Sequence, residues 1–167
     1  ISVIVHPQSV VHSMVEMVDG SVIAQMGVTD MKHPIQYALT YPDRQPNCLE
    51  PLDLRALSSL TFEEPDLERF PCLGLAYDAL KKGGTAPAVL NAANEIAVQA
   101  FLDEEIGLKD IGDIDEAVMR EHQTATADSL ESILAADSWA RGRAIIMLNE
   151  TAGARVKHYN AGQPVSL

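Results

Sequence analysis

The chain has 167 residues, of which 47% are apolar and 22% charged, which is enough apolar material for one or two small compact units. Its 24 acidic residues outnumber the 12 Lys and Arg residues, and the formal net charge of −12 argues against a nucleic-acid partner, because nucleic acids attract basic surfaces. No apolar run approaches the roughly 18 residues of a membrane-spanning helix, so we expect no membrane partner either.

The cysteine content and the first residues bear on where the protein works. Cys48 and Cys72 are too few for a disulfide framework, which indicates a reducing compartment, and we expect a cytoplasmic protein. The chain begins at Ile1 within a strand-like run and shows neither an initiator Met nor the pattern of a signal peptide. We therefore expect it to be a segment cut from a longer polypeptide.

The first 28 residues alternate in hydrophobicity, as β-strands do, and carry an Asp-Gly pair at residues 19–20. A two-residue turn at this pair would pair Val15 with Ala24 and place His12 beside Gly27. The predicted hairpin has one mixed face and one core face. The core face would carry Val11, Val15, Met17, Val22, Ala24, Met26 and Val28.

Apolar residues recur at the helical spacing of three and four in the rest of the chain. Helices are predicted over residues 31–41, 73–82, 89–101 and 108–122. Two more are predicted nearer the C-terminus, one beginning at Asp128 with a capping-box-like Glu131 and one capped by Asp137. The helices beyond residue 72 would close into a small bundle.

Five prolines between residues 42 and 71 indicate an ordered linker rather than a long regular element. The fold class that follows is α+β, with a β-hairpin or sheet remnant, a linker and a small C-terminal α-helical bundle. The predicted boundaries are residues 1–42 for the first part, 43–71 for the linker, 72–150 for the bundle and 151–167 for a frayed tail.

The common catalytic motifs are absent: there is no Gly-rich phosphate loop, nucleophile elbow, His-Glu-x-x-His or Cys-x-x-Cys. His6 and His12 would lie roughly 20 Å apart in an extended chain, which is too far to share a metal ion. For His12 two interpretations stay open. The ring is either half-buried and bonded to its neighbours, or functional beside the helix start that follows Thr29 and Asp30.

A polar patch formed by Asn91, Asn94 and Glu95 lies on one side of a predicted helix. It could position a ligand, but no second carboxylate or His at helical spacing completes a catalytic set, so we favour hydrogen bonds to an adjoining helix or loop. A second acidic cluster lacks the spacing of a calcium loop and is interpreted as a solvated edge. Its members are Asp110, Asp113, Asp115 and Glu116.

Four strings in order along residues 1–150 resemble the 1-deoxy-D-xylulose 5-phosphate reductoisomerase family. They are Val-His-Pro-Gln-Ser-Val-Val-His-Ser-Met at 5–14, Asp-Gly-Ser-Val-Ile-Ala-Gln at 19–25, Asp-Met-Lys-His-Pro-Ile at 30–35 and Leu-Asn-Ala-Ala-Asn-Glu at 90–95. The resemblance implies that the chain contains the end of the catalytic domain, the linker and the C-terminal helical bundle, without the nucleotide-binding domain.

The family rearranges 1-deoxy-D-xylulose 5-phosphate and reduces the product with NADPH to 2-C-methyl-D-erythritol 4-phosphate, assisted by Mg²⁺ or Mn²⁺, in isoprenoid precursor biosynthesis. The resemblance therefore implies NADPH and a divalent metal as cofactors, a sugar phosphate as substrate and a homodimer as the assembly. The main cofactor and metal ligands would lie outside this segment, so the segment alone is expected to be inactive.

Two residues acquire roles through the resemblance. His12 corresponds to a family residue near the active site and is expected to be catalytic, and Met31 is expected to lie at the nicotinamide or substrate side and to bind the cofactor. No metal ligand is assigned. Thr29 stands where relatives often have Pro, so the geometry of this loop could differ. The alternative hypothesis is a non-catalytic acidic helical module that acts in assembly.

Overall fold

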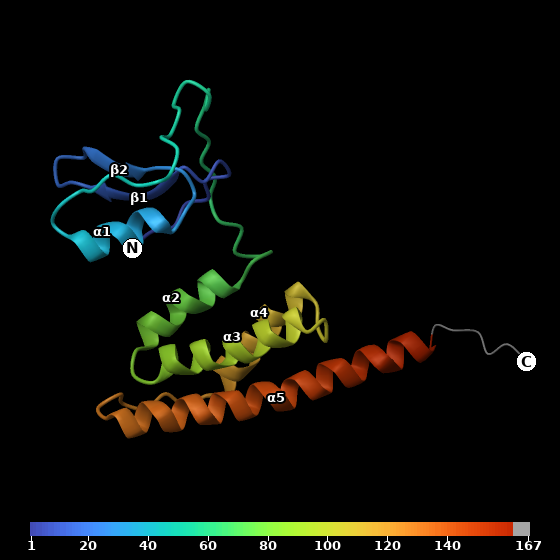
Figure 1. The fold of residues 1–167 in the computed structure, drawn as a ribbon. Helices are drawn as coiled ribbons and strands as arrows, with labels where there is room; N and C mark the ends of the chain where they lie inside the picture. Colours follow the sequence, from blue (N-terminus) through green and yellow to red (C-terminus); the bar gives the residue numbers. More distant parts are fainter. Residues whose placement is uncertain (162–167) are drawn as a thin grey trace, which may run out of the picture. The chain divides into compact units, whose positions relative to one another are not determined.

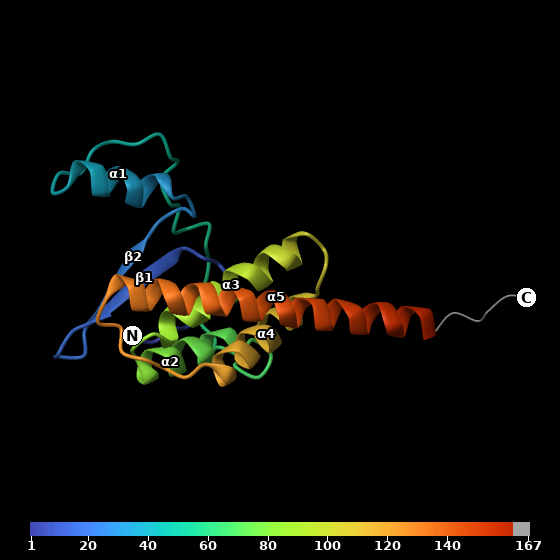
Figure 2. The same ribbon diagram turned by 90° about the horizontal axis from the view of Figure 1, so that it is seen from below.

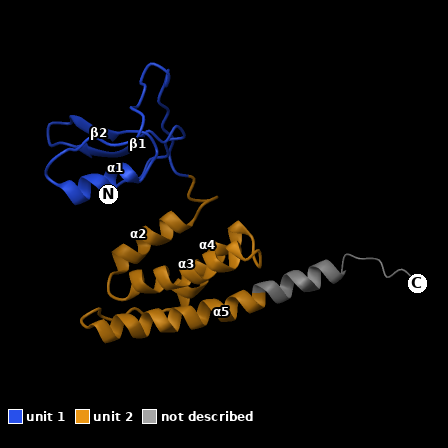
Figure 3. Cartoon of the chain, in the orientation of Figure 1, with its two compact units in different colours: residues 1–65 blue, residues 66–167 orange. Residues whose placement is uncertain are grey.

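The structure is a computed structural model that describes the backbone of residues 1–161 and the side chains of residues 1–150. The chain divides into two compact units, Ile1–Pro65 and Asp66–Leu167 (Figure 3). The first contains a two-stranded sheet and one helix, and the second contains four helices (Figure 1). The predicted α+β class is confirmed, while the domain boundaries drawn from the sequence stay predictions. Within the described residues, no helix is both long and apolar enough to cross a membrane.

The first unit is built on an antiparallel hairpin of β1 (Val11–Glu16) and β2 (Val22–Met26). The predicted register is wrong by one residue, because Val15 pairs with Ile23 instead of Ala24. The reason lies in the turn. Met17 N–H donates to the Ser21 carbonyl at 2.8 Å, so the loop has three residues and ends on Gly20 at φ +82°. A loop of this length with Gly in the left-handed region is a common alternative to the two-residue turn.

Because side chains alternate along a strand, the one-residue shift changes which residues of β2 lie beside each residue of β1 on the two faces of the hairpin. The predicted core face does not form within residues 1–65: Val15, Val22 and Met17 are 58%, 57% and 44% exposed. Nearly all side chains of the two strands are exposed, on both faces of the sheet.

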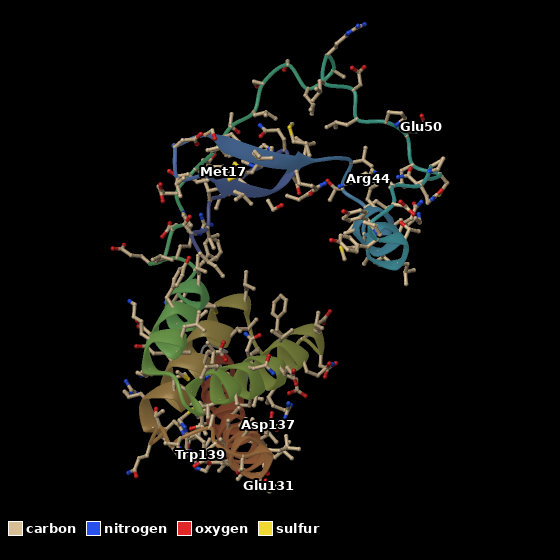
Figure 4. All side chains as sticks on the ribbon, turned by 90° about the vertical axis from the view of Figure 1, so that its left-hand side faces the viewer. Met17, Arg44, Glu50, Glu131, Asp137 and Trp139 are labelled. Carbon is tan, nitrogen blue, oxygen red and sulfur yellow. The ribbon has the colours of Figure 1, made fainter. Side chains whose placement is uncertain are left out.

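The helix α1 (Lys32–Thr40) follows the hairpin and is held to the following loop by its polar side chains. Gln36 Nε2 donates to the Pro46 carbonyl at 2.9 Å, and the guanidinium of Arg44 lies 4.1 Å from the ring centre of Tyr37 (Figure 4). The loop is therefore folded against α1, as expected for an ordered linker.

The rest of the linker returns to the N-terminal segment. Val5 and Glu63 exchange two backbone hydrogen bonds of 2.9 Å, and the rings of His6 and Phe62 stack with centroids 4.8 Å apart. These contacts explain why the first unit extends to Pro65.

The second unit is a helical bundle centred on α3 (Ala86–Leu102). This helix packs against α2 (Cys72–Lys82), α4 (Leu108–Glu121) and α5 (Leu130–Ala161) (Figures 1 and 2). Its buried side chains are nearly all methyl groups, which lets the neighbouring helix backbones approach closely. They are Ala86, Val89, Ala92, Ala93, Ala97 and Ala100.

The C-terminal part of the bundle differs from the prediction in three ways. One continuous helix replaces the two predicted helices, because Asp137 forms an ion pair of 2.8 Å with Arg141 one turn later instead of capping a new helix. Ser129, rather than Asp128, caps the helix, since the N–H of Ser132 donates to its Oγ at 3.1 Å. The helix also continues through residues 151–161 of the predicted tail, and residues 162–167 lie outside the described residues.

The turn between α2 and α3 is fastened to the loop before α5 by a buried threonine. Thr85 is 1% exposed, its Oγ1 lies 2.8 Å from His122 Nε2, and it accepts the N–H of Ala125 at 3.1 Å. Gly84 has φ +51°, and a Cβ on it would collide with the Ala125 carbonyl. Only glycine fits this approach.

Replacing Thr85 with Val should destabilise the bundle. The substitution keeps the shape of the side chain but leaves His122 Nε2 and the N–H of Ala125 without their hydrogen-bond partner. We expect a loss of about 1–3 kcal/mol in the free energy of unfolding, measured by urea denaturation. Thr126→Val is the matched control, since Thr126 is exposed and donates only to Asp128. Equal effects of the two substitutions would contradict a structural role for the Thr85 hydroxyl.

Candidate functional site

The first candidate site is a pocket of about 250 Å³ between the hairpin and the start of α1. It brings together His12 and Met31, the two residues singled out from the sequence. We call it the His12 pocket. Its lining consists of His12, Gln25, Val28, Thr29, Asp30, Met31, His33 and Pro34.

His12 lies in this pocket because of a backbone irregularity that the sequence did not indicate. Val11 pairs with Met26 and Ser13 pairs with Gln25, so His12 is the extra residue of a β-bulge. The predicted position beside Gly27 is therefore wrong, and the N–H of Gly27 donates to the Val10 carbonyl at 3.0 Å. A bulge redirects the side chain of its extra residue, which explains how His12 faces the helix start despite the register shift.

The loop before α1 is fixed by its own polar side chains. Thr29 Oγ1 donates to the Ser9 carbonyl at 2.7 Å, and Asp30 Oδ1 accepts the N–H of Lys32 at 2.8 Å. The Lys32 N–H is the main cause that lowers the pKa of Asp30, and the Lys32 ammonium at 3.3 Å adds to it. Asp30 therefore presents a fixed negative charge at the pocket rim.

The pocket exposes groups that are suited to binding and proton exchange. Met31 is 68% exposed, so its thioether can lie against a ligand. His12 is exposed, and none of the hydrogen bonds found among residues 1–150 engages its ring. An imidazole without a fixed partner is available to hydrogen-bond a ligand. His33 shares the pocket and was missed in the sequence, where only its place two residues after Met31 pointed to it.

Potential metal ligands are not clustered among the described side chains. The described side chains contain no group of three or more His, Cys, Asp or Glu residues arranged to hold a metal ion. His12, Asp30 and His33 line one pocket, but their side chains are not arranged to hold a metal ion.

The second candidate site lies in the helical bundle and centres on a buried carboxylate. Asp115 of α4 has no exposed surface, and its Oδ2 accepts the Asn94 amide at 3.0 Å, with Cys72 Sγ 3.9 Å away. Its Oδ1 is also buried and has no hydrogen-bond partner among the described residues. Asp115 was assigned to a solvated acidic edge, and this assignment is wrong.

The signal that would have placed Asp115 correctly is its spacing. It stands four residues after Ile111 and three before Val118, both of which are buried, so it occupies the apolar stripe of α4. Burial raises the pKa of Asp115 to about 6, although the Asn94 hydrogen bond acts in the opposite direction. Burial, followed by the neighbouring Asp115 charge, raises the pKa of the Cys72 thiol, so this thiol is not activated.

The polar patch on α3 is structural, as favoured from the sequence. Asn94 bonds to Asp115, while Asn91 Nδ2 donates to Glu95 at 2.9 Å. Glu95 in turn pairs with Arg141 of α5 at 2.7 Å. Figure 4 shows Asp137, the second carboxylate bonded to Arg141, on the same helix α5. These bonds tie α3 to α4 and α5.

Stability should depend on pH through Asp115. Its folded-state pKa of about 6 lies above the value of 3.8 for an ordinary Asp, so the folded state binds the proton more tightly and is favoured as pH falls through this window. At pH 7 the Asp115→Asn variant should be more stable than the parent chain by up to about 3 kcal/mol, and this advantage should shrink towards pH 4.

Urea denaturation of both proteins between pH 4 and pH 7 measures this difference. Asp113→Asn, which removes an exposed carboxylate from the same helix, controls for the change in net charge. An advantage of Asp115→Asn that stays constant over this pH range would contradict the buried, proton-binding carboxylate.

The comparisons with known proteins agree with one another. The family model described as "DXP reductoisomerase C-terminal domain" matches residues 26–143. The 1-deoxy-D-xylulose 5-phosphate reductoisomerase of Chlorobium phaeobacteroides (strain DSM 266) is 58% identical over 141 residues, covering 84% of this chain and 37% of the relative. That of Cupriavidus metallidurans is 55% identical over 153 residues, covering 92% of this chain and 39% of the relative.

Solved structures of the same kind are similar. The reductoisomerase from Zymomonas mobilis in complex with NADPH is 50% identical, with a TM-score of 0.79, over 87% of this chain and 38% of that one. A DOX-P reductoisomerase in complex with NADPH, fosmidomycin and magnesium is 45% identical, with a TM-score of 0.82, over 87% of this chain and 38% of that one.

The chain thus spans well under half the length of the relatives that it matches. The matched region nevertheless includes most of both units, and the family resemblance in the sequence strings is confirmed. The chain belongs to the 1-deoxy-D-xylulose 5-phosphate reductoisomerase family and corresponds to its C-terminal region.

Proposed function

We propose that this chain is the C-terminal portion of an NADPH- and divalent-metal-dependent enzyme that converts 1-deoxy-D-xylulose 5-phosphate to 2-C-methyl-D-erythritol 4-phosphate. The observation that carries the proposal is identity of 55–58% over most of the chain with reductoisomerases of that name. The exposed apolar side chains of the hairpin support it as well, because a sheet with two uncovered faces suits a piece of a larger catalytic domain.

In this proposal the first unit supplies one wall of the active site. Met31 and the apolar Val28 and Pro34 line the His12 pocket and offer a surface for the nicotinamide ring or the substrate. His12 lines the same pocket and would orient a substrate hydroxyl or move its proton. Its exposure and its unengaged ring support this role.

The cofactors would be held mainly by residues outside this chain. A related solved structure is a complex with NADPH, fosmidomycin and magnesium. When bound, NADPH supplies the hydride, and Mg²⁺ or Mn²⁺ acts as the Lewis acid that stabilises negative charge on the substrate oxygens. The described residues contain no cluster that fits a divalent metal.

The second unit would have a structural role in the enzyme. Its buried polar contacts, from Asn94 to Asp115 and from Glu95 to Arg141, support a structural role. We further propose that the enzyme is a cytoplasmic homodimer whose partner is a small sugar phosphate, without nucleic acid or membrane. The net charge of −12 supports the exclusion of nucleic acid.

The alternative, a non-catalytic acidic assembly module, is not favoured. It would leave unexplained why relatives covering 84–92% of this chain are named as one enzyme.

The activity can be tested with the complete gene product and with the 167-residue chain in parallel. The complete protein, given 1-deoxy-D-xylulose 5-phosphate and Mg²⁺, should oxidise NADPH, and the 167-residue chain should not. The loss of NADPH absorbance measures both. Absence of activity in the complete protein, with Mg²⁺ and with Mn²⁺, would remove the enzyme hypothesis.

Substituting His12 with Ala in the complete enzyme should lower kcat by about 10²-fold, the lower end of the range for proton-transferring side chains. Because the ring is exposed, the free energy of unfolding should change by less than about 0.5 kcal/mol. His6→Gln is the control, since that ring stacks on Phe62 and does not line the pocket. Unchanged turnover in His12→Ala would return His12 to a structural role.

A further inference from the structure

We propose that the bundle contains a binding site for a small organic ammonium ion, with Asp115 as the acceptor of its N–H groups. The site is the Asp115 pocket, a space of about 390 Å³ formed by α2, α3 and α4 within the second unit. Its lining consists of Cys72, Ala76, Ala79, Leu80, Pro87, Leu90, Asn91, Asn94 and Asp115. The proposal does not depend on the activity of the longer enzyme.

The first observation is the unpartnered oxygen of the carboxylate. Oδ2 of Asp115 is bonded to Asn94, whereas the buried Oδ1 accepts no hydrogen bond from the described residues. A buried carboxylate oxygen without a donor is costly, and proteins normally satisfy such groups. A ligand with N–H donors would satisfy it and would gain a charge-assisted hydrogen bond.

The second observation is the chemistry of the walls. Apart from Asp115, the polar groups of the lining are two amides and one thiol, and the other residues are apolar. No Lys, Arg or His lines the pocket, so the charge of Asp115 has no cation beside it within the lining. The negative field of a chain with net charge −12 also favours a cation over an anion.

A metal ion fits this pocket less well than an organic cation. Asp115 is the only carboxylate of the lining, and no group of three metal-ligating side chains exists among the described residues. The side chains of Ala76, Leu80 and Leu90 instead provide an apolar surface that can cover a hydrocarbon body. The ligand class is therefore an amine with a short apolar group.

Access to Asp115 requires a small movement at the pocket rim, because the carboxylate has no exposed surface. One side chain of the lining next to the carboxylate is Cys72, whose Sγ lies 3.9 Å from Oδ2 and forms only a weak contact. Leu80, also on the lining, is 68% exposed and free to change rotamer. Replacing Cys72 with Ala should therefore leave binding intact or strengthen it.

Three probes with the same ring test the proposal on the unmodified 167-residue chain: benzylammonium, benzyl alcohol and benzoate. Binding is followed at pH 7.5 by NMR shifts of the Asn94 side-chain amide and the Ala79 methyl group, both in the pocket lining. Benzylammonium should bind saturably, at least about tenfold more tightly than the alcohol, and benzoate should not bind.

Two variants locate the interaction. Asp115→Asn should weaken benzylammonium binding by about tenfold or more, whereas Asp113→Asn, which removes an exposed charge from the same helix, should change it less than about twofold. Equal affinity for the ammonium and the alcohol would overturn the proposal, since apolar burial alone would then explain binding. Failure of benzylammonium to shift the pocket resonances would overturn it as well, and this probe comparison requires no variant to fold.

Discussion

The close packing of α3 against three other helices is the constraint on which the second unit depends. Five of its six buried side chains are alanine, so the neighbouring backbones lie close and little space is left for adjustment. Contacts around this helix are consequently specific. Glycine is required at Gly84, and Thr85 fills a fully buried position at the preceding turn.

A carboxylate in such a core affects both the stability of the bundle and the ligands that it could bind. Asp115 occupies a position where its neighbours in α4 are apolar, and it has one amide partner for two oxygens. Burial disfavours its charged form, which links the stability of the bundle to pH. Asp115 also lines a pocket that has no Lys, Arg or His in its lining, and this is the basis of the proposed ammonium site.

The first unit obeys a different constraint. Its hairpin has no apolar layer over it within residues 1–65, and its order comes from local polar contacts, such as those of Thr29 and Asp30, and from the linker that returns to residues 5–8. These contacts fix the loop between β2 and α1, and thereby the relation of His12 to Met31. The proposed active-site wall therefore depends on a bulge and a loop rather than on a packed core.

The sequence by itself determined the α+β class, the four helices that begin at residues 32, 72, 86 and 108, and the family. Hydrophobic periodicity and specific sequence strings are local signals, so they can be recognised without knowing which other segments pack against them. Tertiary structure decided the rest. The three-residue turn and the bulge at His12 depend on cross-strand hydrogen bonds, and the burial of Asp115 depends on which helix covers that face of α4. An acidic residue in an apolar stripe looks solvated until the partner helices are in place, because burial is a property of the whole bundle.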